Sequence, residues 1–153
     1  AMWASYYDYV LDHVETLRSP FDERYPLYVL VESEGTDTER DREVFEATLS
    51  SALNAGIIEN AVVAQSQKDT QLFWNIRDGI GEITPSLIPY ATFDISLPIG
   101  EMSEFLDRVH QDLTTQFTNA TKLVFGHIGD NNLHLVITTG TTKDVKKIFD
   151  VEF

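Results

Sequence analysis

The sequence predicts an α+β fold: a ferredoxin-like sandwich with a mainly antiparallel sheet and helices packed on one face. Strand and helix patterns alternate along the middle of the chain as strand–helix–strand, helix, strand–helix–strand and one closing strand. The 153 residues suffice for a single domain with its own core, and 42% of them are hydrophobic. Neither internal repeats nor low-complexity tracts interrupt this order.

The N-terminal half alternates between helical and strand patterns: helix 2–17, strand 27–35, helix 36–56, strand 59–66 and helix 66–85. The first strand is rich in β-branched and apolar residues and ends at Gly35. The next helix has a capping-box pattern from Thr38 to Asp41 and a terminating Gly56. Pro85 is expected to end the last of these helices.

The C-terminal half continues the alternation: strand 91–99, helix 101–117, strands 122–128 and 133–139, and the start of a helix at 143. The helix has apolar residues at helical spacing, which predicts one buried face. The last two strands flank a Gly-Asp-Asn-Asn turn. Because the sequence ends within a predicted amphipathic helix, we expect it to be a piece of a larger protein.

Composition narrows the function classes and partners. The net charge of −14, from 25 acidic and 11 basic residues, disfavours nucleic acid and anionic membrane surfaces. No apolar run approaches the roughly 20 residues that a membrane span needs. The chain has no cysteine, which excludes disulfides and fits a reducing compartment, and its acidic N-terminus is unlike a secretion signal. We expect a cytoplasmic protein, free or peripheral to a membrane in an electron-transfer complex, and leave a homo-oligomer open.

The segment GHIGDNNLH places His127 and His134 on either side of a tight turn. In a hairpin with Asp130 and Asn131 at its tip, the two histidines are expected to be directly opposed, with Cβ atoms about 4.5–5.5 Å apart. Two imidazoles at that spacing can converge on one metal ion. The alternative is a histidine pair that completes the sheet face through hydrogen bonds, because two ligands do not close a metal site.

Three motifs, in order along the chain, resemble one known family. GHIGDNNLH resembles the G-H-x-G-D-G-N-x-H signature of the C-terminal domain of FAD-linked oxidases, the flavoproteins that include D-lactate, glycolate and D-2-hydroxyglutarate dehydrogenases. LFWNIRDGI (72–80) resembles the family helix L-W-x-x-R-E-x-I, and FDISLPI (93–99) resembles its strand Y-D-[IVL]-S-[LV]-P. The resemblance covers essentially the whole chain, so residues 1–153 are identified as one substrate-binding cap domain of ferredoxin-like type.

The resemblance implies an enzyme that oxidises a D-2-hydroxy acid by hydride transfer to FAD. It implies that His127 and His134 bind a divalent metal (Zn, Fe or Mn) and that Arg77 binds the substrate carboxylate, a role that suits a planar guanidinium. Asp130 and Asn132 are expected to support the turn. The module that holds FAD would precede this chain and a further metal ligand and a base would follow it, so the isolated chain is expected to lack flavin and turnover.

Three positions depart from the family pattern. Asn131 stands where the family usually has Gly, and Asn also accepts a left-handed turn. Gly81 and Thr92 stand where the 2-hydroxyglutarate-type members have Thr and Lys. Without that lysine a clamp for a second carboxylate is incomplete, so we expect a substrate similar to lactate or glycolate.

Other functions are left open by the residues themselves. Arg77 can be a surface arginine that neutralises Asp78 and Glu82. The chain can be a non-catalytic ferredoxin-like module for ligand binding or oligomerisation, or a metal-dependent hydrolase that uses the histidine pair. A flavin-binding module in the same polypeptide would favour the FAD-dependent enzyme over these alternatives.

Overall fold

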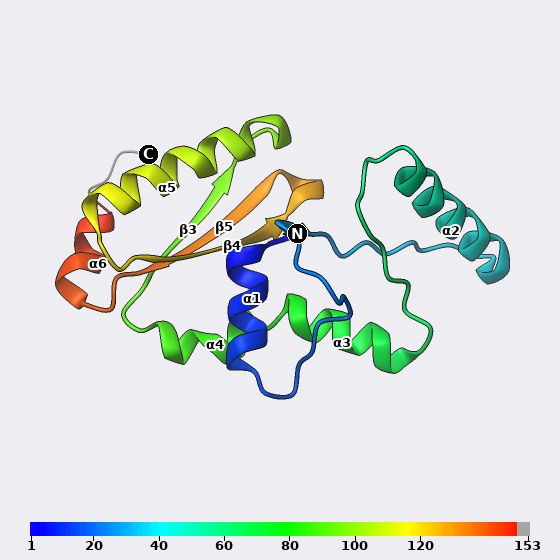
Figure 1. Cartoon of the computed structure of the whole chain (residues 1–153), viewed down its shortest axis with the longest axis horizontal. Helices are drawn as coiled ribbons and strands as arrows, with labels where there is room; N and C mark the ends of the chain where they lie inside the picture. The colour runs from blue at the N-terminus through cyan, green and yellow to red at the C-terminus, as the bar shows by residue number, and fades with distance from the viewer. Residues whose placement is uncertain (150–153) are drawn as a thin grey trace.

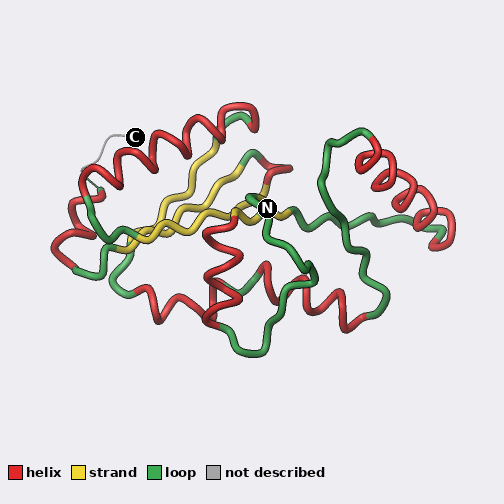
Figure 2. The backbone as a smooth tube through the Cα atoms, in the orientation of Figure 1, coloured by secondary structure: helices red, strands yellow, loops and turns green. Residues whose placement is uncertain are grey.

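The computed structural model describes residues 1–149, which form an α+β domain around one five-stranded antiparallel sheet (Figure 1). The strands lie side by side in the order β2-β1-β4-β5-β3, and Figure 2 shows them in yellow with helices around them. Their bounds are β1 Met2–Trp3, β2 Leu27–Tyr28, β3 Ala91–Ser96, β4 Thr121–His127 and β5 Asn132–Thr138. The helices are α1 Ala4–His13, α2 Thr38–Asn54, α3 Gln67–Arg77, α4 Ile80–Leu87, α5 Met102–Gln116 and α6 Thr142–Ile148, with 3₁₀ turns at Ile99–Glu101 and Ile128–Asp130.

The C-terminal half forms a split βαβ unit, as the sequence predicts. Strands β3 and β4 are joined through α5, and β5 lies between them and is antiparallel to both. β3 and β4 are therefore parallel to each other, with one strand inserted between them. The α+β class and the antiparallel sheet are confirmed.

Helices cover both faces of the sheet, so the expectation of helices on one face is wrong in that detail. Figure 1 shows α5 and α6 on one side and α1 and α4 on the other. On β4 and β5, consecutive residues face opposite cores: Leu123 and Val136 pack against α1 and α4, whereas Val124 and Leu135 pack against α5 and α6. A near-continuous apolar run such as LHLVI is typical of a strand buried on both faces.

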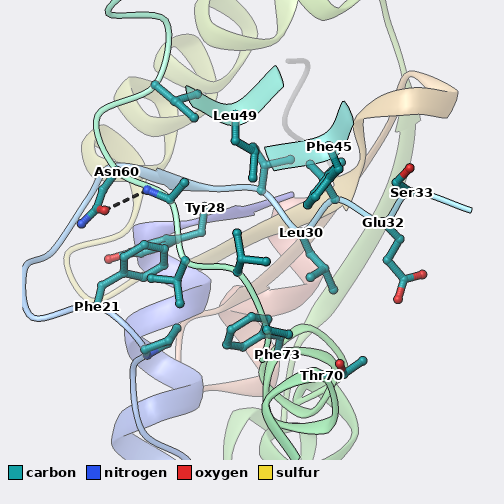
Figure 3. A pocket seen from close by; sticks show the side chains of 18 of the residues that line it. Phe21, Tyr28, Leu30, Glu32, Ser33, Phe45, Leu49, Asn60, Thr70 and Phe73 are labelled. Carbon is teal, nitrogen blue, oxygen red and sulfur yellow. Dashed lines mark hydrogen bonds between the residues drawn. The ribbon is translucent and has the colours of Figure 1, made fainter. Parts of the chain in front are cut away.

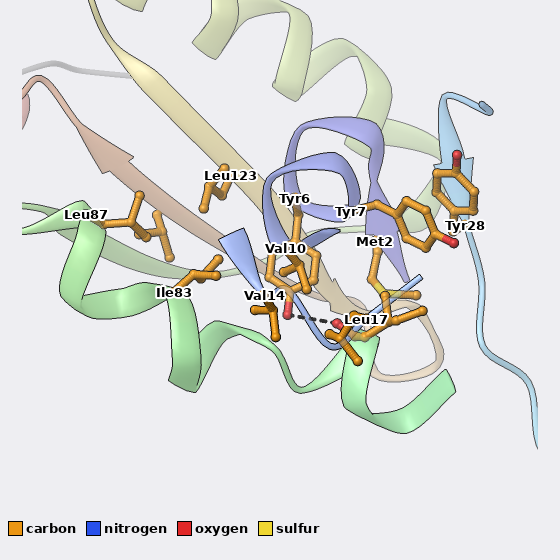
Figure 4. Packing of buried hydrophobic residues seen from close by; sticks show 12 residues of the cluster. Met2, Tyr6, Tyr7, Val10, Val14, Leu17, Tyr28, Ile83, Leu87 and Leu123 are labelled. Atoms are coloured by element: carbon orange, nitrogen blue, oxygen red, sulfur yellow. Dashed lines mark hydrogen bonds between the residues drawn. The ribbon is translucent and has the colours of Figure 1, made fainter. Parts of the chain in front are cut away.

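The tyrosines of α1 form the centre of one core (Figure 4). Tyr6 is 0% exposed and Tyr7 is 3% exposed. The Tyr6 hydroxyl donates to the carbonyl of Arg77 at 2.8 Å and accepts from the backbone N–H of Ile80 at 3.0 Å. Since those two residues end α3 and begin α4, one buried tyrosine fixes how these helices join.

The helix expected over 66–85 is in fact two helices, α3 and α4, and Pro85 lies inside α4 instead of ending a helix. The break falls at Gly79, which approaches α1 so closely that a Cβ there would lie 2.5 Å from a methyl of Val10. The orphan N–H of Ile80 then finds its acceptor in Tyr6. Close packing against α1, which no local pattern reveals, accounts for the break.

The strands expected over 27–35 and 59–66 are also largely absent. Only Leu27–Tyr28 pairs, with the two-residue β1, and the remaining residues of both segments form no ladder. The helix between them, α2, has no buried residue and lies apart from the sheet in Figure 1. Among residues 1–149, no helix is long and apolar enough to cross a membrane.

Candidate functional site

The β4–β5 hairpin carries both signature histidines, in a register two residues away from the predicted one. Phe125 is opposite His134, and His127 is opposite Asn132, so the prediction that the two histidines oppose each other directly is wrong. The reason is the turn: a 3₁₀ segment followed by Asn131 in the left-handed region (φ 56°) makes a loop of four residues, 128–131. The left-handed conformation expected of Asn131 is confirmed.

A shift of two residues preserves the face on which a side chain lies, because side chains alternate along a strand. The imidazoles of His127 and His134 are therefore diagonal neighbours on one face. Their ring centres lie 5.4 Å apart and the ring planes meet at 84°. Two imidazoles that bind one tetrahedral ion have ring centres about 5 Å apart, so the observed spacing is compatible with a shared ion.

Arg77, at the C-terminal end of α3, lies against the same pair. Its Nη2 atom is 2.9 Å from Nε2 and 3.3 Å from Nδ1 of His127, and its Nη1 atom donates to Asp78 at 2.5 Å. Burial and then the guanidinium of Arg77 lower the pKa of His127, with a further contribution from His134. A neutral imidazole has a free lone pair, which can accept a hydrogen bond or bind a metal.

Asp94 completes the cluster, and the sequence reasoning assigned it no role. Strand β3 places Asp94 directly opposite His134, and the two side chains are hydrogen-bonded through Asp94 Oδ1 and His134 Nδ1. The available signal was the outward-facing polar series Thr92, Asp94 and Ser96 in a strand whose other residues face the core. The pairing itself depends on the register between β3 and β5, which a local pattern does not contain.

The residues in and around the turn have different surroundings. Asp130 lies in the 3₁₀ segment and counteracts the lowering of the His127 pKa. The side-chain oxygen of Asn132 is buried and has no hydrogen-bond partner among residues 1–149. Gly126 permits the close approach of the two strands, because a Cβ there would lie 2.3 Å from the carbonyl oxygen of Asn132.

The described residues do not form a complete metal site. No group of three or more His, Asp and Glu side chains that could hold an ion exists within residues 1–149. The two imidazoles fit two of the ligands of a metal site. His134 keeps Nε2 available while its Nδ1 bonds to Asp94. His127 can bind an ion only if Arg77 moves aside. Imidazole nitrogens suit zinc and iron, and a third ligand must come from outside these residues.

A groove of about 1130 Å³ lies away from the histidine pair (Figure 3). It is lined by the segments around Leu30 and Val62 and by helices α2 and α3. Its lining is mainly apolar, and in Figure 3 Phe45 and Leu49 of α2 lie across from Phe73 of α3. The carboxylate of Glu32 accepts a hydrogen bond from Trp74 at its edge. This groove does not contain the three residues that the sequence singled out, so it is not the candidate site.

Comparison with known proteins identifies the family of the chain. A profile of the family described as "FAD linked oxidases, C-terminal domain" matches residues 2–151. The chain is 33% identical over 138 residues to "D-2-hydroxyglutarate dehydrogenase, mitochondrial" of Arabidopsis thaliana, which covers 90% of this chain and 24% of that protein. It is 32% identical over 131 residues to "D-2-hydroxyglutarate dehydrogenase" of Stutzerimonas stutzeri, which covers 86% of this chain and 28% of that protein.

A third relative is named for a different substrate. A putative mitochondrial D-lactate dehydrogenase of Schizosaccharomyces pombe is 28% identical over 137 residues, which covers 84% of this chain and 26% of that protein. The chain therefore spans about a quarter of the length of each of these three relatives.

Proposed function

The chain belongs to the family of FAD-linked oxidase C-terminal domains, and from this premise we propose that it is the substrate-binding domain of an FAD-dependent oxidoreductase that oxidises a D-2-hydroxy acid. Residues 1–153 would form one such domain, with the FAD-binding module upstream and the remaining ligand segment downstream. The observation that carries the proposal is the convergence of Arg77, His127 and His134 from three separate segments on one surface.

Each of these residues has a proposed task. Arg77 binds the substrate carboxylate through its guanidinium, which can form two parallel hydrogen bonds to a carboxylate. His127 and His134 hold a divalent metal ion with a third ligand from outside the described residues, and Asp130 and Asn132 support the turn between them. A bound ion would supply Lewis-acid polarisation of the 2-hydroxyl, FAD would supply the acceptor for the hydride from the adjacent carbon, and a base from outside this chain would take the hydroxyl proton. The chain's own residues orient the substrate between these two groups.

The substrate is proposed to be a monocarboxylate similar to lactate or glycolate. The outward-facing residues of β3 are Thr92, Asp94 and Ser96, and none of them is cationic. Gly81 offers no side chain at the start of α4. Arg77 is then the one side-chain cation, within residues 1–149, that is hydrogen-bonded to the histidine pair, which suits a single carboxylate. The names of two relatives give a dicarboxylate, 2-hydroxyglutarate, so the substrate is where this protein is proposed to differ.

The test uses the complete protein that contains this chain, purified with its flavin. We expect reduction of the flavin by D-lactate or glycolate, and an Arg77→Ala variant with kcat/KM lower by roughly 10- to 100-fold, because a charge-assisted hydrogen bond to the carboxylate is lost. His127→Ala should lose metal and activity while it retains flavin. Arg42→Ala, in α2, is the matched control. Unchanged turnover and metal content in both site variants would contradict the proposal.

An alternative is a non-catalytic module for ligand binding or oligomerisation, favoured by the exposed apolar residues around α2, such as Val29, Val44 and Ile57. A complete reading frame without a flavin-binding module would favour that alternative. A cytoplasmic location also stays a proposal, supported by the lack of cysteine. Cell fractionation tests it, and recovery of the protein with an organelle would contradict it.

A further inference from the structure

We infer that Asp94 is a positioning residue for His134, because its carboxylate holds the imidazole proton on Nδ1 and leaves Nε2 as the nitrogen with a free lone pair. The inference rests on the proposed function in one respect only: that Nε2 of His134 is the atom that binds the metal. The hydrogen bond itself, between Asp94 Oδ1 and His134 Nδ1, is part of the structure.

The backbone fixes the distance between the two side chains. Strands β3 and β5 pair over six consecutive residues, from Ala91 with Ile137 to Ser96 with Asn132, and Asp94 is directly opposite His134 within this ladder. Directly opposed residues on one face of an antiparallel pair have Cβ atoms about 4.5–5.5 Å apart. The carboxylate therefore reaches the imidazole without an adjustment of either strand.

The ring of His134 has other neighbours that limit its rotation. Its centre lies 5.1 Å from the ring centre of Phe125 and 5.4 Å from that of His127. The His134 side chain is 25% exposed, whereas Asp94 is 76% exposed. A half-buried imidazole between two rings, with one exposed carboxylate at its edge, has one defined hydrogen-bond acceptor within the described residues.

The acceptor at Nδ1 decides which ring nitrogen of His134 can bind a metal. A neutral imidazole carries its proton on either Nδ1 or Nε2, and only the other nitrogen has a lone pair. A carboxylate that accepts from Nδ1 selects the tautomer in which Nε2 can bind a metal. A cross-strand pair that only stabilises the sheet would not select a tautomer. The two roles are therefore distinguishable by the position of the proton.

The first experiment determines the position of the proton. In the ¹⁵N-labelled 153-residue chain at about pH 8.5, where histidine is ordinarily neutral, long-range ¹H–¹⁵N spectra report which ring nitrogen is protonated. We expect the Nδ1–H form of His134 in the wild type, and a shift towards the Nε2–H form in Asp94→Ala and in Asp94→Asn, whose amide N–H can donate to Nδ1. Ser96→Ala, at the next outward-facing position of β3, is the control and should not change the tautomer.

An unchanged backbone spectrum in each variant establishes that the fold is intact, which is expected because Asp94 is exposed. If His134 carries its proton on Nε2 in the wild type, or if its tautomer is the same in the wild type and in both Asp94 variants, the inference is overturned.

The second experiment separates this inference from the proposed function. Titration of the chain with Zn²⁺ alone should show affinity about 10- to 100-fold weaker in Asp94→Ala than in the wild type or in Ser96→Ala. If the tautomer shifts in Asp94→Ala while the zinc affinity stays equal, the proposed metal role of His134 fails and the positioning role of Asp94 stands.

Discussion

The hairpin sheet, formed by β3, β4 and β5, and the α2 arm, residues 29–65, have similar apolar strand patterns and opposite outcomes. Strands β4 and β5 have several residues that are 0–2% exposed, whereas no residue of the α2 arm is buried. The difference is one of partners: β5 has a strand on each edge and helices on each face, whereas β2 lies at the edge of the sheet. A strand pattern therefore indicates a capacity to pair, and pairing requires a neighbour.

The largest expected difference between the two regions is in hydrogen exchange. Amides of β4 and β5 should exchange only on unfolding of the whole domain, whereas those of the α2 arm should exchange many orders of magnitude faster, because the arm lacks burial and ladders. Exchange followed by NMR on the 153-residue chain measures both regions at once. Protection of residues 29–33 or 59–65 comparable to that of β5 would remove the contrast.

A second prediction concerns Gly126, where the strands of the hairpin approach closely. Gly126→Ala should lower the free energy of unfolding by about 2–4 kcal/mol, because its Cβ would lie 2.3 Å from a backbone oxygen that cannot move aside. Gly81→Ala is the control: its Cβ has open space in the first turn of α4, so stability should stay equal or rise by up to about 1 kcal/mol. Urea unfolding measures both, and equal midpoints would contradict the described hairpin.

A third prediction compares the same substitution in each region. Leu135→Ala in β5 should cost about 2–5 kcal/mol, because the side chain is 0% exposed and its loss leaves a cavity. Leu53→Ala in α2 should cost less than about 1 kcal/mol, because that side chain is 38% exposed. Thermal and urea unfolding measure the two changes. A comparable loss in Leu53→Ala would mean that the arm is packed in solution.

The smallest expected effect is electrostatic. Burial and Arg77 lower the pKa of His127, so Arg77→Gln should raise that pKa towards its ordinary value, whereas Arg42→Gln in the α2 arm should not change it. A base whose pKa is lowered by folding binds fewer protons in the folded state. Its contribution to stability is therefore complete above about pH 6.5 and is lost as the pH falls through the folded value. NMR titration of the His127 ring measures the pKa. A changed His127 pKa in Arg42→Gln would mean that the α2 arm influences the electrostatics of the site.

The sequence predicts the face of the site better than its register. Alternation along a strand is local, so His127 and His134 share a face whether the loop has two residues or four. The pairing depends on where the loop lies: the 3₁₀ turn and the left-handed Asn131 place it at residues 128–131, centred one residue nearer the N-terminus than a turn at 130–131, and this shifts the register by two. Asn131 was predictable because few residues tolerate a positive φ.

Long-range neighbours account for the other differences. The hydrogen bond between Asp94 and His134 needs the register of β3 against β5, and the break between α3 and α4 needs Tyr6, more than 70 positions away. Neither can be obtained from periodicity in a short window. The strands predicted in the α2 arm are largely absent for the same reason. A short stretch of sequence shows that a segment can form a strand, but it does not show whether a partner strand is available.

The insertion of β5 between β3 and β4 has a consequence for synthesis on the ribosome. β5 is translated last of the three, so a nascent chain that has emerged only as far as Asp130 contains Arg77, Asp94 and His127 but lacks the strand that joins them. In the finished fold β3 and β4 lie about 10 Å apart and are joined only through β5, so before β5 is present they have no hydrogen bonds to each other. The site can therefore form only after the residues up to Thr138 have emerged from the ribosome.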